Sequence, residues 1–104
     1  MNKYLRIAWK LTSRSLAKQQ RMAAVIVKGG AVLDYGHNYL FNHAERRAIK
    51  PHRDYAGATI YVMRHNRGCS RPCNDCQQLI INAGIKRAVY VAKDGSTVVE
   101  SYGG

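Results

Sequence analysis

The sequence RPCNDC at residues 71–76, followed by the apolar run QQLIINA at residues 77–83 and then by Gly84, organises the rest of the chain. Proline is common at the start of a helix and glycine directly after its end, so this stretch predicts a helix that begins near Cys73 and stops at Gly84. Side chains three residues apart lie on one face of a helix. Cys73 and Cys76 are therefore expected to form a pair of thiolate metal ligands that needs further ligands.

A second segment, HAE at residues 43–45, supplies what the cysteine pair lacks. It opens a helix-like run at residues 43–50 that Pro51 ends. His43 and the two cysteines make three ligands suited to Zn²⁺. Three protein ligands leave one tetrahedral position for water, which is typical of a catalytic zinc and not of a structural one. Glu45 stands close enough to that water to act as a general acid and base.

Together these motifs resemble the zinc-dependent cytidine and deoxycytidylate deaminase superfamily. The resemblance runs from about Val25 to Glu100 and includes Gly36 and Asn38 before the HAE triplet, and it continues through GIKRAVY at residues 84–90. The chain most resembles the short deaminases encoded by bacteria and their phages. The resemblance implies a hydrolase that converts cytosine to uracil, with Zn²⁺ as cofactor, His43, Cys73 and Cys76 as metal ligands, and Glu45 as the catalytic residue.

The resemblance also implies substrate-binding roles for three positions. Asn38 would contact the sugar or base, although an asparagine there could instead cap a strand end. The backbone N–H of Ala44 would bind the base carbonyl. Ser70 would lie near the leaving amine. Arg71 is a fourth substrate-binding candidate because of its charge: it belongs, with Arg46, Arg47, Arg64 and Arg67, to a group of arginines near the site that could hold a phosphate chain.

Length and composition limit the class of protein. A chain of 104 residues has room for one domain, which we place at residues 1–104. No apolar run approaches the length of a membrane span and the first residues lack a signal peptide's apolar region, so no membrane partner is expected. The three cysteines are an odd number with two committed to a metal pattern, which predicts a reducing, cytoplasmic setting.

The charge is unusual, because 17 Lys and Arg face only 6 Asp and Glu, a net charge of +11. Such a surface attracts polyanions, nucleic acid first, although a basic protein without any polyanion partner is the plain alternative. One helix-spaced basic stripe lies near the N-terminus: Lys3, Arg6, Lys10, Arg14, Lys18 and Arg21.

The pattern of elements predicts an α/β fold. A helix is expected at residues 3–20, and strands at residues 23–28, 31–36, 58–63, 87–92 and 97–102, with hairpin turns at Gly29-Gly30 and Asp94-Gly95. Strand-helix-strand crossovers imply parallel pairing in the middle of the sheet. We therefore expect a three-layer αβα sandwich, as in the cytidine deaminase fold, with a five-stranded mixed sheet and a C-terminal antiparallel hairpin. The first helix would cover one face, the two zinc-bearing helices the other.

Several functions use these residues. Cytosine in single-stranded DNA or RNA is the favoured substrate, with a cytosine nucleotide of the dCMP type close behind. Transfer-RNA adenosine deaminases share the HAE triplet but typically place a helix between their last two strands. In another class, Cys69, Cys73 and Cys76 with His43 or His65 would close a zinc site in a non-catalytic nucleic-acid-binding module. A homo-oligomer is compatible with any of these.

Overall fold

The computed structural model describes residues 2–14, 21–37, 44–50 and 53–102, without the side chains of Arg14, Glu45 and Arg46. Its elements, in chain order, are α1 (Lys3–Leu11), the 3₁₀ turn η1 (Thr12–Arg14), β1 (Met22–Lys28), β2 (Ala31–His37), α2 (Ala44–Ala48), β3 (Thr59–Arg64), α3 (Asn74–Asn82), β4 (Arg87–Val91) and β5 (Thr97–Ser101).

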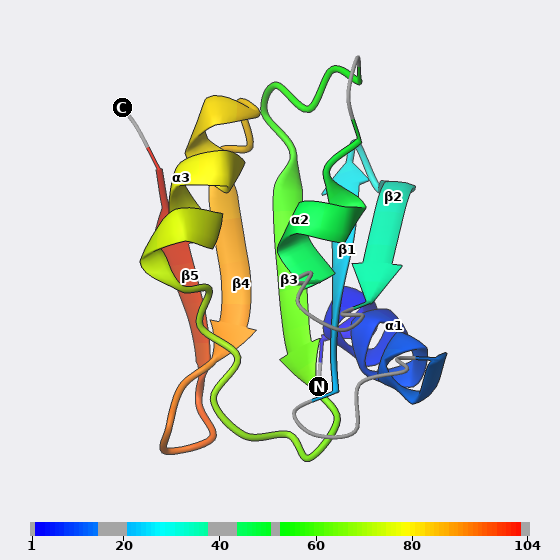
Figure 1. The fold of residues 1–104 in the computed structure, drawn as a ribbon, viewed down its shortest axis with the longest axis vertical. Helices are drawn as coiled ribbons and strands as arrows, with labels where there is room; N and C mark the ends of the chain where they lie inside the picture. The colour runs from blue at the N-terminus through cyan, green and yellow to red at the C-terminus, as the bar shows by residue number, and fades with distance from the viewer. Residues whose placement is uncertain (1, 15–20, 38–43, 51–52, 103–104) are drawn as a thin grey trace.

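The five strands form one mixed sheet in the order β2-β1-β3-β4-β5 (Figure 1). Strand β1 is antiparallel to both β2 and β3, β3 is parallel to β4, and β4 is antiparallel to β5. The parallel pair in the middle and the C-terminal hairpin confirm the predictions. The crossover through α2 passes over β1, so β3 pairs with β1 although it runs in the same direction as β2.

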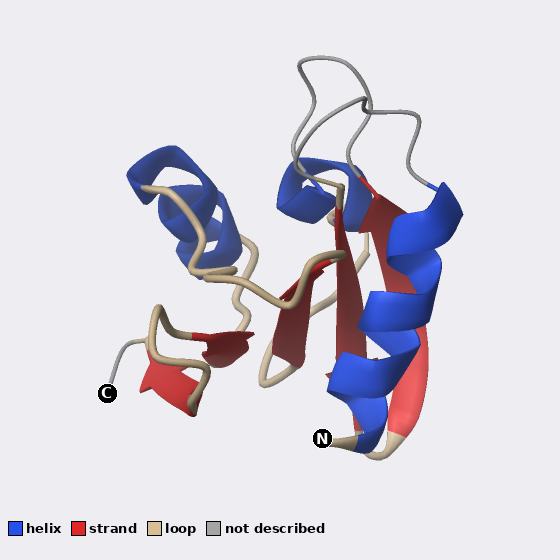
Figure 2. Cartoon of the chain, turned by 90° about the horizontal axis from the view of Figure 1, so that it is seen from below, coloured by secondary structure: helices blue, strands red, loops and turns tan. Residues whose placement is uncertain are grey.

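Helices cover both faces of the sheet, which confirms the αβα sandwich (Figure 2). Alternate residues of a strand point to opposite faces, and β1 shows this directly. Ala24 and Ile26 join a buried cluster that includes Ala44 and Ala48 of α2 and Ile80 of α3. The intervening residues pack on the other side: Val25 and Val27, with Leu5 and Ala8 of α1.

Helix α3 ends where the sequence predicted. Gly84 has a φ of +85°, a left-handed conformation that other residues adopt only at a cost. Its N–H donates to the oxygen of Ile81 at 3.0 Å, and the N–H of Ile85 donates to the oxygen of Ile80 at 3.2 Å. Two of the last carbonyls of the helix are thereby satisfied, and the chain turns directly into β4.

The first helix is shorter than the predicted span of residues 3–20, because α1 ends at Leu11. Asn2 caps its start by accepting hydrogen bonds from the N–H groups of Tyr4 and Leu5. At its end the hydroxyls of Thr12 and Ser13 donate to main-chain oxygens three residues back, a local alternative that competes with helix continuation. Residues 15–20 lie outside the described part. No helix of the described residues has the length and apolar character needed to span a membrane.

Candidate active site

Those predicted site residues that the structure describes, Ala44, Ser70, Arg71, Cys73 and Cys76, lie at one end of the sheet. Register pairs Met22 with Arg64 and Ala23 with His37, so the start of β1 meets the ends of β2 and β3. The arrowheads of β2, β3 and β4 all point this way (Figure 1). Because α2 and α3 follow β2 and β3, their N-termini open at the same end, which we call the site end.

Helix α3 presents the cysteine pair at its N-terminus. Cys73 is the N-cap residue and is exposed, while Cys76 lies in the first turn and is 2% exposed. The helix therefore begins one residue later than predicted, and both cysteines stand at its start, neither of them in a disulfide bond. Gln77 steadies this turn, because its side-chain amide donates to the oxygen of Pro72 at 2.9 Å. Two sulfur atoms at the start of one helix are donors of the kind that zinc prefers.

Helix α2 lies directly on the backbone of β2, and Gly36 makes this possible. A Cβ atom at Gly36 would lie 2.5 Å from the nitrogen of Ala48, 2.7 Å from the carbonyl carbon of Arg47 and 2.8 Å from the oxygen of Ala44. These are backbone atoms of the helix, which cannot swing away as a side-chain tip could. Gly36, part of the sequence resemblance, therefore fixes the helix that carries the HAE triplet.

The structure describes only some of the predicted residues around the HAE triplet. Ala44 is the first residue of α2 and is buried. The backbone of Glu45 lies in that helix, but its side chain is outside the description, and His43 and Asn38 are outside the described residues altogether. Their assigned roles stay predictions.

Ser70 has a structural role that the sequence did not reveal. Its hydroxyl is fully buried, donates to the oxygen of Val62 at 2.7 Å and accepts from the N–H of Val91 at 2.9 Å. Its own N–H donates to the oxygen of Val91 at 2.9 Å. Ser70 thus joins β3 to β4 beyond their last paired residues. Its contact with substrate stays a prediction, and it would have to come from the main chain.

Arg71 is held over the C-terminal hairpin. Its Nε donates to Tyr90 Oη at 3.3 Å, and its terminal nitrogen lies 3.4 Å from Glu100 Oε1. The Tyr90 hydroxyl donates to the same carboxylate oxygen at 3.2 Å. Hydrogen bonds to Tyr90 and Glu100 raise the pKa of Arg71 above its usual value. Glu100 was not among the predicted site residues, although strand alternation places it on the same face as Tyr90.

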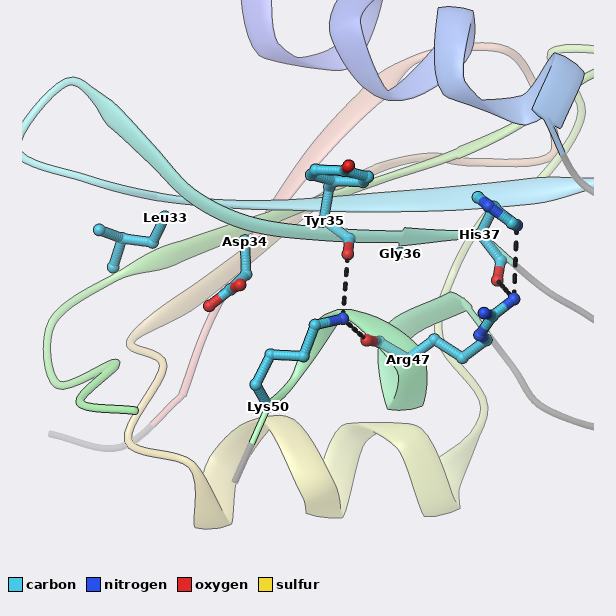
Figure 3. Close-up of a pocket in the computed structure, with 7 residues that line it drawn as sticks. All are labelled: Leu33, Asp34, Tyr35, Gly36, His37, Arg47 and Lys50. Carbon is cyan, nitrogen blue, oxygen red and sulfur yellow. Dashed lines mark hydrogen bonds between the residues drawn. The ribbon is translucent and has the colours of Figure 1, made fainter. Parts of the chain in front are cut away.

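A pocket of about 370 Å³ lies away from the cysteine pair, along the edge strand β2. Its lining residues are Leu33, Asp34, Tyr35, Gly36, His37, Arg47 and Lys50 (Figure 3). Three basic side chains donate hydrogen bonds to main-chain oxygens of alternate residues of β2. Arg53 donates to Leu33 at 2.9 Å, Lys50 to Tyr35 at 3.3 Å and Arg47 to His37 at 3.1 Å. The same Lys50 ammonium also donates to the oxygen of Arg47. This edge is thereby closed to pairing with another strand.

The rival closed zinc site is not assembled. Within the part of the chain that the structure describes, no three His, Cys, Asp or Glu side chains gather closely enough to hold a metal. Cys69, Cys73, Cys76 and His65 are all described, and they do not form such a group in the structure. The predicted catalytic site, with His43, Cys73 and Cys76 as ligands, is not tested by this finding, because His43 lies outside the described residues.

Comparison with known proteins supports the geometry. The chain matches the cytidine and deoxycytidylate deaminase zinc-binding region over residues 1–92. The crystal structure of dCMP deaminase from the cyanophage S-TIM5 is similar, with a TM-score of 0.71 and 25% identity over 91% of this chain and 89% of that one. The crystal structure of a deaminase/reductase from Thermotoga maritima is also similar, with a TM-score of 0.65 and 29% identity. The match covers 86% of this chain but only 28% of the Thermotoga chain. Cytidine deaminase from Burkholderia pseudomallei shares the fold, with a TM-score of 0.69 and 23% identity over 97% of this chain and 93% of its own.

Proposed function

Because the chain belongs to the cytidine and deoxycytidylate deaminase family, whose zinc-binding region spans most of its length, we propose that it hydrolyses cytosine to uracil and ammonia in single-stranded nucleic acid. The observation that carries the proposal is the cysteine pair in the first turn of α3, at the same end of the sheet as the start of α2. Zn²⁺ is the cofactor of this family.

The donor set suits that metal. Cys73 and Cys76 lie within one helical turn and are not in a disulfide bond, and His43 immediately precedes the first residue of α2. We assign these three residues as the zinc ligands. When bound there, zinc supplies the Lewis acidity that makes water a nucleophile at neutral pH.

The protein's own groups would then handle the base and its protons. The first N–H groups of a helix have no intrahelical partner, so the N–H of Ala44 is suited to bind the base carbonyl. Glu45 would take a proton from the attacking water, place it on N3 and pass a proton to the exocyclic nitrogen. The bond between C4 and that nitrogen breaks, ammonia leaves, and oxygen from water remains on the ring.

The charge supports a polymeric substrate. Exposed cations stand around the site end, among them Arg21, Arg67, Arg71 and Lys93. A single phosphate needs fewer cations than these, whereas a strand of phosphates can use them all. A base in a duplex would first have to be flipped out at a cost of a few kcal/mol, so single strands should be preferred.

A second candidate substrate is a free cytosine nucleotide. The observation that favours it is the similarity to the cyanophage dCMP deaminase over nearly the whole of both chains. Adenosine in transfer RNA is less favoured, because β4 and β5 are joined by a tight turn in which the N–H of Gly95 donates to the oxygen of Ala92 at 3.0 Å. The resemblance to transfer-RNA deaminases would require a helix there.

A product assay decides among these substrates. Zinc-loaded protein is offered cytidine, dCMP, a cytosine-containing DNA oligonucleotide and the matching RNA, side by side at low salt, with Glu45→Gln as the blank. Uracil in an oligonucleotide is the expected result. Rapid dCMP turnover without oligonucleotide product would leave a nucleotide deaminase, and no uracil from any substrate would end the proposal. We also propose a cytoplasmic setting, which the absence of a disulfide among the three described cysteines supports, and a homo-oligomer is compatible with the proposal.

A further inference from the structure

Three planar side chains gather beside the loop that leads to the cysteines. The guanidinium carbon of Arg67 lies 4.4 Å from the centre of the Trp9 ring. The His65 and Trp9 rings are nearly parallel, with an angle of 16° and a centroid separation of 6.4 Å. Arg67 and His65 are exposed, and Trp9 is half-buried. These residues come from the end of α1 and from the loop after β3, so they lie at the site end.

Hydrogen bonds fix this group in place. Trp9 Nε1 donates to the oxygen of His65 at 2.9 Å, which ties the helix to the loop. The buried Thr12 hydroxyl donates to the oxygen of Trp9 at 2.5 Å and lies 2.8 Å from His65 Nδ1. A hydroxyl carries one hydrogen, so the second bond requires the proton on His65 Nδ1. The imidazole is thereby held in one orientation.

The backbone at Arg67 indicates that its side chain is used. Arg67 has a φ of +61° and is the one non-glycine among the described residues with a positive φ. Glycine would adopt this conformation without cost, whereas arginine is strained there. The guanidinium over Trp9 offsets part of that strain through a cation–π contact. Such strain is a feature of functional sites.

One guanidinium nitrogen of the adjacent Arg64 lacks an acceptor in the part of the chain that the structure describes. Arg64 Nε is buried and has no hydrogen-bond partner among the described residues. Arg64 ends β3, and alternation from Ile60 and Val62 places it on the face that carries α2 and α3. A buried donor without an acceptor is costly, and a phosphate oxygen would supply what is missing.

We propose that Trp9, His65 and Arg67 form a stacking surface for the nucleotide next to the target cytosine, with Arg64 holding a phosphate of the same strand. The inference rests on the proposed function. Unpaired bases stack on aromatic rings and on arginine planes without regard to sequence, and phosphates pair with arginine. A free nucleotide has no neighbouring base, so this surface would serve a strand alone.

Fluorescence of Trp9, the chain's sole tryptophan, gives a direct readout of this surface. A thymine nonamer with one central cytosine is titrated at low salt into zinc-loaded Glu45→Gln protein, which prevents turnover. We expect quenching of Trp9 on binding. Removing the base on one side of the cytosine, while keeping the sugar-phosphate, should weaken binding about tenfold and reduce the quenching.

Variants at Arg67 separate stacking from charge. Arg67→Gly relieves the backbone, so it should fold, and should weaken binding of the intact nonamer about tenfold. Arg67→Lys keeps the charge without the planar group and should lose most of the same affinity. Arg87→Ala, at the far end of β4, removes an equal charge and should change affinity by less than about twofold.

The outcomes are separable from those of the proposed function. Equal losses in Arg67→Gly and Arg87→Ala, full affinity in Arg67→Lys, or no effect of the missing base would overturn the stacking surface. Uracil formation in the oligonucleotide by wild-type protein decides the proposed function by itself. If the wild-type protein deaminates oligonucleotides but these binding effects are absent, the proposed function is supported and the stacking surface is refuted.

Discussion

At the scale of single residues, the sequence motifs predict separate tasks for the residues of the site. Glu45 is expected to move protons, and Cys73 and Cys76 are expected to hold the metal. Glu45→Gln keeps the size and hydrogen-bonding capacity of the side chain but removes the base. We expect an intact fold, bound zinc and deamination at least ~100-fold slower, the usual value of acid–base catalysis. Loss of zinc from this variant would instead make Glu45 a ligand.

The metal itself is tested through Cys73. One zinc ion per chain is expected in purified protein, and Cys73→Ala should lose it because two ligands hold zinc weakly. Metal analysis by mass spectrometry gives the stoichiometry. Cys69→Ser is the matched control, since Cys69 is half-buried but not gathered with the other two cysteines. Full zinc in Cys73→Ala, or loss of zinc in Cys69→Ser, would contradict the assignment.

Gly36 allows helix α2 to lie close to strand β2. Gly36→Ala places a methyl group less than 3 Å from the backbone of α2, so the helix must shift. We expect a loss of roughly 1–3 kcal/mol in the free energy of unfolding, as in other overpacked sites, together with weaker zinc binding. Gly29→Ala is the control, because it meets open space and is strained only by its φ of +60°. Urea unfolding and zinc titration of both variants separate the two effects, and equal zinc affinity in both would refute this role of Gly36.

At the scale of elements, one network ties the loop after α2 to the edge strand β2. The buried Tyr55 hydroxyl donates to Asp34 Oδ2 at 2.7 Å and accepts from the N–H of Lys50 at 2.8 Å. Arg53 Nε donates to the same carboxylate oxygen at 2.9 Å. Burial by itself raises the pKa of Asp34, but the hydrogen bonds from Tyr55 and Arg53 outweigh it and the pKa is lowered from its usual 3.8.

This shift has a defined consequence for stability. A carboxyl whose folded pKa is depressed stabilises the fold above its unfolded pKa, and the contribution is lost as the pH falls through the folded value. Asp34→Asn should therefore be less stable than wild type at pH 7, and the difference should shrink below about pH 4. Urea unfolding at both pH values measures it. A difference that is unchanged or larger in acid would contradict the network.

The elements were predicted far better than their ends and their long-range bonds. Alternating apolar residues and the Gly-Gly and Asp-Gly turns fixed every strand to within a residue or two, because these signals are local. The end of α1 was missed, since hydroxyl bonds such as Thr12 to Trp9 compete with the helix in a way that its apolar spacing does not show. The roles of Ser70 and Glu100 depend on strands that meet only in the folded chain, and period-two alternation was the one available signal.

At the scale of the whole molecule, net charge alone does not locate a nucleic-acid path, because exposed cations also stand far from the site end. Lys86 and Arg87 lie at the start of β4, opposite the cysteine pair. Lys28 at the end of β1 is partly offset by Asp54 at 3.8 Å. The path of a bound nucleic-acid strand therefore has to be located by the positions of the cations that affect binding and not by the net charge.

Salt dependence makes that distinction. Each phosphate that a cation neutralises on a single strand contributes a slope of about −0.7 in a plot of log affinity against log salt. Replacing Arg67 and Arg71 by Ala should flatten the slope by about 0.7 for each of the two that also neutralises a phosphate, and should lower turnover of an oligonucleotide more than turnover of dCMP. Replacing Lys86 and Arg87 by Ala removes the same charge at the opposite end and should leave slope and turnover close to wild type. Because both double variants have the same net charge, equal slopes in the two would mean that the strand is attracted by overall charge and does not pass the site end.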